Sequence, residues 1–397
     1  MRILIIWRAQ FMGASGGMEK ICTDMCNALI RRSHHVGLLY CGEKPGKPFF
    51  PISSQAELIN MASGTGERGA YMPLWAAGVR ECLRVMDKHK MHQWVSSRKN
   101  RYYGQQVQDN ISVFQPDVLV AFDITSAMLI QDAFHGDVPV PMATMFHFPV
   151  KEALRYHSKQ ERAALQKSGC IQVLTGDAED WMKQEFPETP VICIPNEVAQ
   201  YERQADLAGD KRQYTVLHVG RLDKYAKRQH LLIDAFARLA DRFPEWGLEL
   251  WGAGKGKYAE ELAAQIRQHH LQNRVFLKGT SNRLEEVYTR ADLFCFPSAF
   301  EGFGLALAEA MSAGLPAVGF RDCPGVNTLI RDGETGLLAG KGAEGLANAM
   351  ELLMKDRSLR VRMGQAARET MKAYAPERIW NQWESLLAEL ARSRQKM

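Results

Sequence analysis

Short, wholly apolar runs alternate with longer helical patterns along most of the chain, and this alternation limits the possible folds more than any other feature. The first half contains RILIIW, HVGLLY, PDVLVAF, PVPMATMF, IQVLT and VICIP; the second contains YTVLHVG, LELWGAG, RVFLKG, DLFCFPS and LPAVGF. Strands that are apolar throughout and separated by helices form parallel sheets covered on both faces. The two series therefore predict an α/β protein with two doubly wound domains.

The length of the chain also favours two domains. With 397 residues, of which 46% are apolar, the chain exceeds what a single core usually holds. Residues 199–213 are polar and lack a strand pattern, so we expect the linker there. The expected domains are 1–198 and 214–375, with a C-terminal helix at about 376–397 that packs back on the first domain.

Composition limits the class of protein and its compartment. A formal net charge of +5 is too small for a typical nucleic-acid-binding protein, but it suits an anionic surface or a phosphate-rich substrate. Only Cys22 and Cys26 are spaced to share a helix face, so we expect free thiols in a reducing cytoplasm rather than a zinc site. No run reaches the roughly 18 apolar residues of a membrane span, and the first run is too short for a signal peptide. We expect a cytosolic protein.

Two segments at predicted strand ends suit phosphate groups. Ligands of open parallel sheets bind at the carboxyl ends of the strands. In GASGGMEK, Gly16 and Gly17 let the backbone approach a ligand, and the following helix offers free N–H groups. In HVGRLDKYAKRQ, Arg221 and Lys227 together suit a diphosphate. Taken singly, the first segment is a weak signal whose alternative is a plain tight turn, and the cations of the second are more often solvated surface residues.

A third segment, SAFEGFGLALAEAMSAG, pairs two glutamates across the start of a helix. Glu301 lies in the loop after a strand, and Glu309 lies two turns inside a helix that begins near Gly304. The rest of this helix is apolar or small, so burying a carboxylate on it is costly without a hydrogen-bonding partner. A pair of sugar or ribose hydroxyls is one candidate partner, and a backbone cap is the other.

Together, the three segments resemble the retaining glycosyltransferases of family four, which have the GT-B architecture of two facing Rossmann-like domains with a cleft between them. The family motifs GG-x-E, GRL…K and Glu-x7-Glu match Gly16-Gly17-Met18-Glu19, Gly220-Arg221-Leu222 with Lys227, and Glu301 to Glu309. CIPNEV, GLPAVGF and GETGLLAG also match in order and spacing. The resemblance covers residues 170–375 well and 1–40 fairly, and it is thin over 45–115.

The resemblance implies a role for each matching residue in binding a nucleotide-sugar donor. Glu309 would hold the ribose hydroxyls, and the backbone of Lys278 would face the base. Glu301 would lie along the donor sugar with the amides of Phe303, Gly304 and Leu305. Arg221, Lys227 and the Gly16 and Gly17 amides would stabilise the leaving diphosphate. The loop that carries Lys227 is one residue longer than usual, so Lys224 is an alternative phosphate ligand.

The resemblance also implies the chemistry of transfer. His147 matches a histidine near the donor sugar, and Asp123, at another strand end, is the acceptor-side candidate. Glycosyl transfer passes through an oxocarbenium-like state that the carboxylate of Glu301 would favour. No Asp-x-Asp pair occurs, so neither a metal nor another cofactor is expected.

The acceptor is inferred from residues 88–103, KHKMHQWVSSRKNRYY, which mix basic and aromatic side chains. This mixture suits an anionic lipid surface, and a solvated helix face is the alternative. Together with the family resemblance, this leads us to expect transfer from a UDP-sugar, favoured over a GDP-sugar, to a lipid-linked or lipopolysaccharide-core glycan. Such an enzyme would lie on the inner face of the cytoplasmic membrane, with no nucleic-acid partner. The alternatives are a nucleotide-sugar epimerase of the same architecture and a non-catalytic nucleotide-sugar-binding protein.

Overall fold

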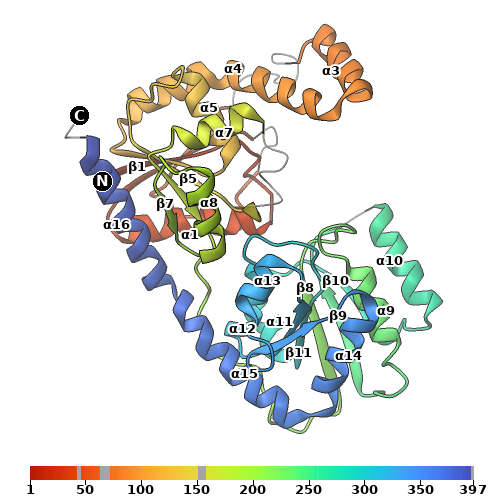
Figure 1. The fold of residues 1–397 in the computed structure, drawn as a ribbon. Helices are drawn as coiled ribbons and strands as arrows, with labels where there is room; N and C mark the ends of the chain where they lie inside the picture. The colour runs from red at the N-terminus through yellow and green to blue at the C-terminus, as the bar shows by residue number, and fades with distance from the viewer. Residues whose placement is uncertain (43–45, 63–71, 151–157, 255, 395–397) are drawn as a thin grey trace. The chain divides into compact units, whose positions relative to one another are not determined.

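Two compact α/β units make up the chain in the computed structural model, which describes residues 1–42, 46–62, 72–150, 158–254 and 256–394 (Figure 1). The first unit comprises Met1–Ile194 with Trp380–Met397, and the second comprises Pro195–Ile379. Each unit holds one parallel sheet with helices around it, as the alternating apolar runs predict. The predicted fold class is confirmed.

The sheet of the first unit has the order β3-β2-β1-β4-β5-β6-β7 among the described residues, and every pair of neighbours is parallel. Its strands are β1 (Arg2–Trp7), β2 (His35–Tyr40), β3 (Glu57–Asn60), β4 (Val118–Ala121), β5 (Met142–Met145), β6 (Cys170–Val173) and β7 (Val191–Cys193). The central strands β1 and β4 are almost wholly buried, because helices cover both of their faces. Sequence reasoning missed only the short, half-exposed edge strand β3.

The helices of the first unit are α1 (Gly17–Arg31), α3 (Leu74–Met86), α4 (Lys88–Phe114), α5 (Ile124–Ala133), α7 (Lys159–Gln166) and α8 (Gly176–Glu185). Helices α4 and α5 pack on one face of the sheet, where Tyr103, Val107 and Phe114 join the core formed by β1 and β4. Helix α3 contacts α4, at the end of α4 that projects away from the sheet (Figure 1).

The sheet of the second unit has the order β10-β9-β8-β11-β12-β13 among the described residues, again wholly parallel. Its strands are β8 (Tyr214–Val219), β9 (Trp246–Trp251), β10 (Val275–Gly279), β11 (Leu293–Phe296), β12 (Ala317–Phe320) and β13 (Gly336–Ala339). Its helices are α9 (Gln229–Ala237), α10 (Lys257–Gln268), α11 (Leu284–Arg290), α12 (Leu305–Ser312), α13 (Pro324–Leu329), α14 (Gly342–Lys355), α15 (Arg357–Met371) and a 3₁₀ turn (Lys372–Tyr374).

The last helix, α16 (Pro376–Arg394), begins in the second unit and continues as part of the first. Within the first unit, Glu384 of α16 pairs with His34 at 2.8 Å, and Asn381 accepts a hydrogen bond from Arg32 at 3.2 Å. Residues 395–397, which we included in the expected C-terminal helix, lie outside the described residues.

The polar segment 199–213, where we expect the linker, lies within the second unit. The carbonyl of Ala199 accepts a hydrogen bond from Ser312 at 2.6 Å, and Lys211 forms an ion pair with Asp292 at 2.7 Å. Its polar side chains and backbone groups thus have partners on that unit, which a sequence pattern alone does not reveal.

Candidate functional site

The loop after β8 carries Arg221, and an aspartate shapes it. Asp223 accepts hydrogen bonds from the backbone N–H groups of Tyr225 at 3.0 Å and Ala226 at 2.8 Å. The same carboxylate accepts a hydrogen bond from the exposed Arg221 guanidinium at 3.2 Å. The hydrogen bond from Ala226, ahead of the other contacts, lowers the pKa of Asp223. The turn is therefore preorganised around an ionised carboxylate, with Arg221 on its outer side.

A buried histidine of β8 and the first glutamine of α9 hold this loop in place through hydrogen bonds. His218 Nδ1 donates to the Cys295 carbonyl of β11 at 3.0 Å, and its Nε2 faces the Gln229 amide nitrogen at 3.2 Å. That amide also donates to the Arg221 carbonyl at 2.9 Å. Burial, more than the charge of Lys227, lowers the pKa of His218 from 6.5 to about 4, so the ring is neutral. A neutral ring that donates through Nδ1 accepts through Nε2, which fits the amide opposite it.

Sequence reasoning missed this supporting pair. The available signals were a histidine inside the otherwise apolar run YTVLHVG and a glutamine at the first position of α9. Gln229 binds the loop backbone, and His218 binds the Cys295 carbonyl and the Gln229 amide, so the pair links β8, its loop and β11.

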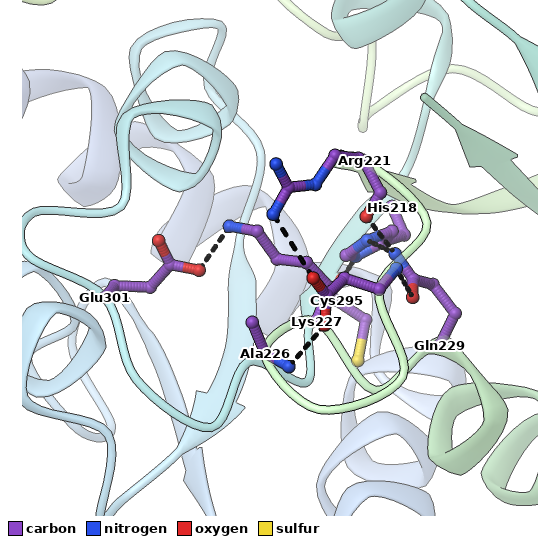
Figure 2. Close-up of polar contacts among 8 residues, drawn as sticks. His218, Arg221, Ala226, Lys227, Gln229, Cys295 and Glu301 are labelled. Carbon is purple, nitrogen blue, oxygen red and sulfur yellow. Dashed lines mark hydrogen bonds and ion pairs between the residues drawn. The ribbon is translucent and has the colours of Figure 1, made fainter. Parts of the chain in front are cut away.

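Lys227 and Glu301 form an ion pair between the loops that follow β8 and β11 (Figure 2). Both side chains are largely shielded from solvent, and the Lys227 ammonium also lies 4.8 Å from the centre of the Phe296 ring. Lys224, the alternative phosphate ligand, instead pairs with Glu261 of α10 at 2.7 Å and is half exposed. The structure thus brings Lys227, and not Lys224, to the first glutamate of the Glu-x7-Glu motif.

The start of α12 requires a glycine. Gly304 precedes the helix with φ of +88°, a left-handed conformation that glycine adopts at little cost, and Leu305 opens the helix. The preceding residue, Phe303, is buried against the ring of Tyr374 at 5.4 Å between ring centres. The first backbone N–H groups of α12, which have no partner within the helix, therefore come directly after the loop that carries Glu301.

The buried carboxylate of Glu309 has a tyrosine partner. The Tyr288 hydroxyl of α11 donates to Glu309 Oε2 at 3.0 Å, and both side chains are buried. Burial, followed by the nearby Glu309 charge, raises the pKa of Tyr288 well above its ordinary value, so the phenol stays protonated and donates. The partner that the structure shows for Glu309 Oε2 is therefore a tyrosine hydroxyl. Sequence reasoning missed Tyr288, which the chain carries on a different helix.

Lys278 lies on the edge strand β10. Its ammonium is 3.9 Å from the Glu249 carboxylate and 5.5 Å from the centre of the Trp251 ring, both on β9. The ammonium also lies 5.9 Å from the centre of the Phe276 ring on β10 itself, so its side chain contacts both strands of this sheet edge.

In the first unit, Asp123 and His147 follow the neighbouring strands β4 and β5. Asp123 caps α5, where its Oδ1 accepts from the Ser126 backbone N–H at 2.7 Å and from the Thr125 hydroxyl at 2.8 Å. His147 Nε2 donates to the Phe122 carbonyl at 2.8 Å. Burial lowers the pKa of His147 to about 4, against the opposing charge of Asp123. The imidazole is thus neutral and carries its acceptor lone pair on Nδ1.

Gly16 and Gly17 lie at the exposed start of α1, where Gly16 is the N-cap residue. The Glu19 carboxylate folds back against Gly16 so closely that a side chain at position 16 would displace it. The glycine pair therefore leaves the first N–H groups of α1 accessible beside a carboxylate of the first turn.

The second unit matches a known protein family. Residues 200–370 match the model of "Glycosyl transferases group 1". The chain is 24% identical to an "Uncharacterized glycosyltransferase" of Haemophilus influenzae, over 95% of this chain and 97% of that one. It is 32% identical to the "Lipopolysaccharide core biosynthesis glycosyltransferase LpsE" of Rhizobium meliloti, over 44% of this chain and 49% of the relative. Several other curated relatives also align over about half of their own length or less.

Solved structures share the fold over the whole chain. A sucrose-phosphate synthase from Thermosynechococcus elongatus superimposes with a TM-score of 0.77 at 19% identity, covering 98% of this chain and 99% of its own. Anabaena Alr3699/HepE, crystallised "in complex with UDP and glucose", gives a TM-score of 0.68 at 20% identity, with the same two coverages. The fold is that of the GT-B proteins, and the class that the family match and the relatives support is a glycosyltransferase of group 1.

Proposed function

We propose that this protein is a retaining, metal-independent glycosyltransferase that moves a sugar from a UDP-sugar to a lipid-linked or lipopolysaccharide-core glycan. One observation carries the proposal: Lys227 and Glu301 meet where the order of the second sheet reverses, between the adjacent strands β8 and β11. Ligands of doubly wound sheets bind at such a switch point, outside the carboxyl ends of the strands.

The diphosphate of the donor would bind at this point. Arg221 and Lys227 supply two cations, and the N-terminus of α12 supplies backbone N–H groups at Gly304 and beyond. Glu309 would accept hydrogen bonds from the ribose hydroxyls, and the backbone of Lys278 would face the base. A relative in fold that was crystallised with UDP and glucose supports UDP as the nucleotide.

Bond cleavage leaves positive charge on the donor sugar and negative charge on the departing diphosphate. Glu301 would stabilise the oxocarbenium-like sugar, while Lys227 and Arg221 stabilise the diphosphate. The leaving phosphate oxygen takes the proton of the acceptor hydroxyl, so transfer occurs on the face that the leaving group vacates and the anomeric configuration is retained. The cations fill the role that a metal ion has in other transferases.

The first unit would contribute from its own strand ends. His147, neutral and with Nδ1 as acceptor, would receive a hydrogen bond from a hydroxyl of the donor sugar. Asp123 would lie on the acceptor side, and the α1 amides after Gly16 and Gly17 would contact the diphosphate. In the described part of the chain no helix is both long and apolar enough to cross a bilayer. We propose peripheral contact with the inner face of the cytoplasmic membrane.

The test is an assay with the purified protein, a panel of UDP- and GDP-sugars, and lipid-linked or lipopolysaccharide-core acceptors. We expect nucleoside diphosphate to be released only when acceptor is present, and release to continue in EDTA. NMR of the product should show the anomeric configuration of the donor. Sugar interconversion without acceptor would replace this proposal with an epimerase, and tight nucleotide-sugar binding without turnover on any acceptor would replace it with a binding protein.

A further inference from the structure

Helix α3 turns an apolar stripe toward solvent. Trp75, Val79, Cys82 and Met86 follow one another at spacings of four and three residues, which places them on one side of the helix. Within this stripe Met86 is 81% and Trp75 is 61% exposed, and on the adjoining side of the helix Leu74 is 93% and Val85 is 83% exposed. A helix of a globular protein normally packs such a stripe into the core, so this outward stripe indicates an interaction surface.

Positive charge gathers beside this stripe. Residues 74–103 hold seven Lys and Arg against two acidic residues, an excess of five that equals the net charge of the whole chain. The Arg98 guanidinium of α4 lies 4.6 Å from the centre of the Trp75 ring and 5.3 Å from that of Trp94. This contact joins the apolar stripe of α3 to the basic first half of α4, and we call residues 74–103 the α3–α4 surface.

We infer that the α3–α4 surface docks the protein on an anionic lipid bilayer. The exposed side chains of α3 enter the boundary between headgroups and acyl chains, and the Lys and Arg side chains of α4 bind the headgroup phosphates. The inference rests on the proposed function, because a lipid-linked acceptor makes a membrane the partner that the enzyme must reach. It adds α3 as the inserting element.

The charge distribution favours a bilayer over a second copy of the chain. A two-fold dimer places the same surface on both subunits, so the excess of five positive charges would face an equal excess. An anionic bilayer instead offers negative charge above an apolar layer, in the same arrangement as a basic α4 beside an apolar α3. Tryptophan next to arginine is also the combination found at membrane interfaces.

The first test measures vesicle binding of the full-length protein without nucleotide. Vesicles of phosphatidylcholine containing phosphatidylglycerol are compared with vesicles of phosphatidylcholine alone. The stripe variant combines Met86→Ser in the stripe with Val85→Ser on its adjoining side, and we expect it to weaken binding to the anionic vesicles by about tenfold or more. Val113→Ser is the matched control, because Val113 is also 83% exposed but lies near the C-terminal end of α4. Equal binding by the stripe variant and the control would overturn the inference.

A second test separates insertion from electrostatic attraction. Replacing Lys88, Lys90, Arg98, Lys99 and Arg101 with Gln should reduce binding strongly at low salt and less at high salt, because salt screens the attraction. Brominated acyl chains should quench Trp75 in the wild type, and Trp75→Phe should remove most of that quenching. Unchanged quenching in Trp75→Phe would mean that α3 does not insert.

Two further readouts keep this inference apart from the proposed function. UDP binding should stay unchanged in the stripe variant, which also shows that the variant folds. If the stripe variant loses vesicle binding and the wild type fails the transferase assay, the docking surface is supported and only the proposed reaction is rejected. A concentration-dependent dimer that the stripe variant abolishes, with vesicle binding intact, would assign the surface to self-association and overturn the inference.

Discussion

Lys227 and Glu301, 74 residues apart in the sequence, form an ion pair at the meeting point of β8 and β11. The ammonium thus neutralises the carboxylate. A bound diphosphate would compete with Glu301 for Lys227, and release of the diphosphate would restore the pair. The two residues proposed to stabilise opposite charges during transfer are therefore partners of each other.

The first prediction concerns the cations. Arg221→Ala and Lys227→Ala should each weaken UDP binding by about tenfold to a hundredfold, since hydrogen bonds to charged groups contribute about 1.5–3 kcal/mol. Lys224→Ala is the matched control, because this lysine lies in the same loop but pairs with Glu261. Its effect should stay within about twofold. Isothermal titration measures all three, and a silent Lys227→Ala beside a damaging Lys224→Ala would reverse the assignment.

The second prediction separates the two glutamates. Glu309→Gln should mainly raise the donor KM and weaken UDP binding, because it removes a contact made in both ground and transition states. Glu301→Gln should depress kcat and leave UDP affinity equal to the wild type or slightly higher, since Lys227 loses its competing carboxylate. Full turnover by Glu301→Gln, or a Glu301→Gln variant that no longer binds UDP, would contradict the proposed roles.

The third prediction concerns the tyrosine that sequence reasoning missed. Tyr288→Phe removes only the hydroxyl that donates to Glu309 Oε2. If that hydrogen bond orients Glu309 for the ribose, the variant should show the pattern of Glu309→Gln in milder form, with KM raised by about threefold to tenfold and kcat nearly unchanged.

Tyr214→Phe is the control for Tyr288→Phe, because Tyr214 lies at the start of β8 and stacks on Trp246. An effect of Tyr288→Phe on thermal stability alone, with unchanged donor kinetics, would leave Tyr288 a purely structural residue.

The sequence predicts the alternating strands and helices of the two units. Apolar runs bounded by turn residues marked the eleven strands they were expected to form, and Gly304 marked the start of α12. The edge strands β3 and β13 were not predicted, and both are only partly buried. In β3 a glutamate and an asparagine flank just two apolar residues, so it lacks the continuous apolar run of a central strand, whereas β13 is apolar in sequence.

The contacts that define the site are long-range, and the sequence could not predict them. The partners of Glu301, Glu309 and His218 are 74, 21 and 77 residues away, on elements whose neighbourhood depends on sheet order. The family resemblance assigned a role to each glutamate, but it did not predict that Glu301 pairs with Lys227 or that Glu309 accepts a hydrogen bond from Tyr288. Helix α3 is a different case, because we predicted no element there and only the structure shows that its apolar side chains face solvent.

The last prediction concerns pH. Burial lowers the pKa of His218 from 6.5 to about 4 in the folded protein. Between these values the unfolded chain binds a proton that the folded one does not, so folding stability rises with pH across this window. The contribution of His218 to folding stability is complete above pH 6.5 and is lost as pH falls toward 4, by an amount on the order of 3 kcal/mol.

The variant His218→Gln removes this titration and keeps an amide that can donate to the Cys295 carbonyl. The unfolding temperature of wild type should therefore fall more steeply than that of His218→Gln between pH 6.5 and 4. His269→Gln, a change at an exposed histidine of the same unit, should follow the wild type. A difference between wild type and His218→Gln that stays constant across this pH range would show that the buried ring does not titrate there.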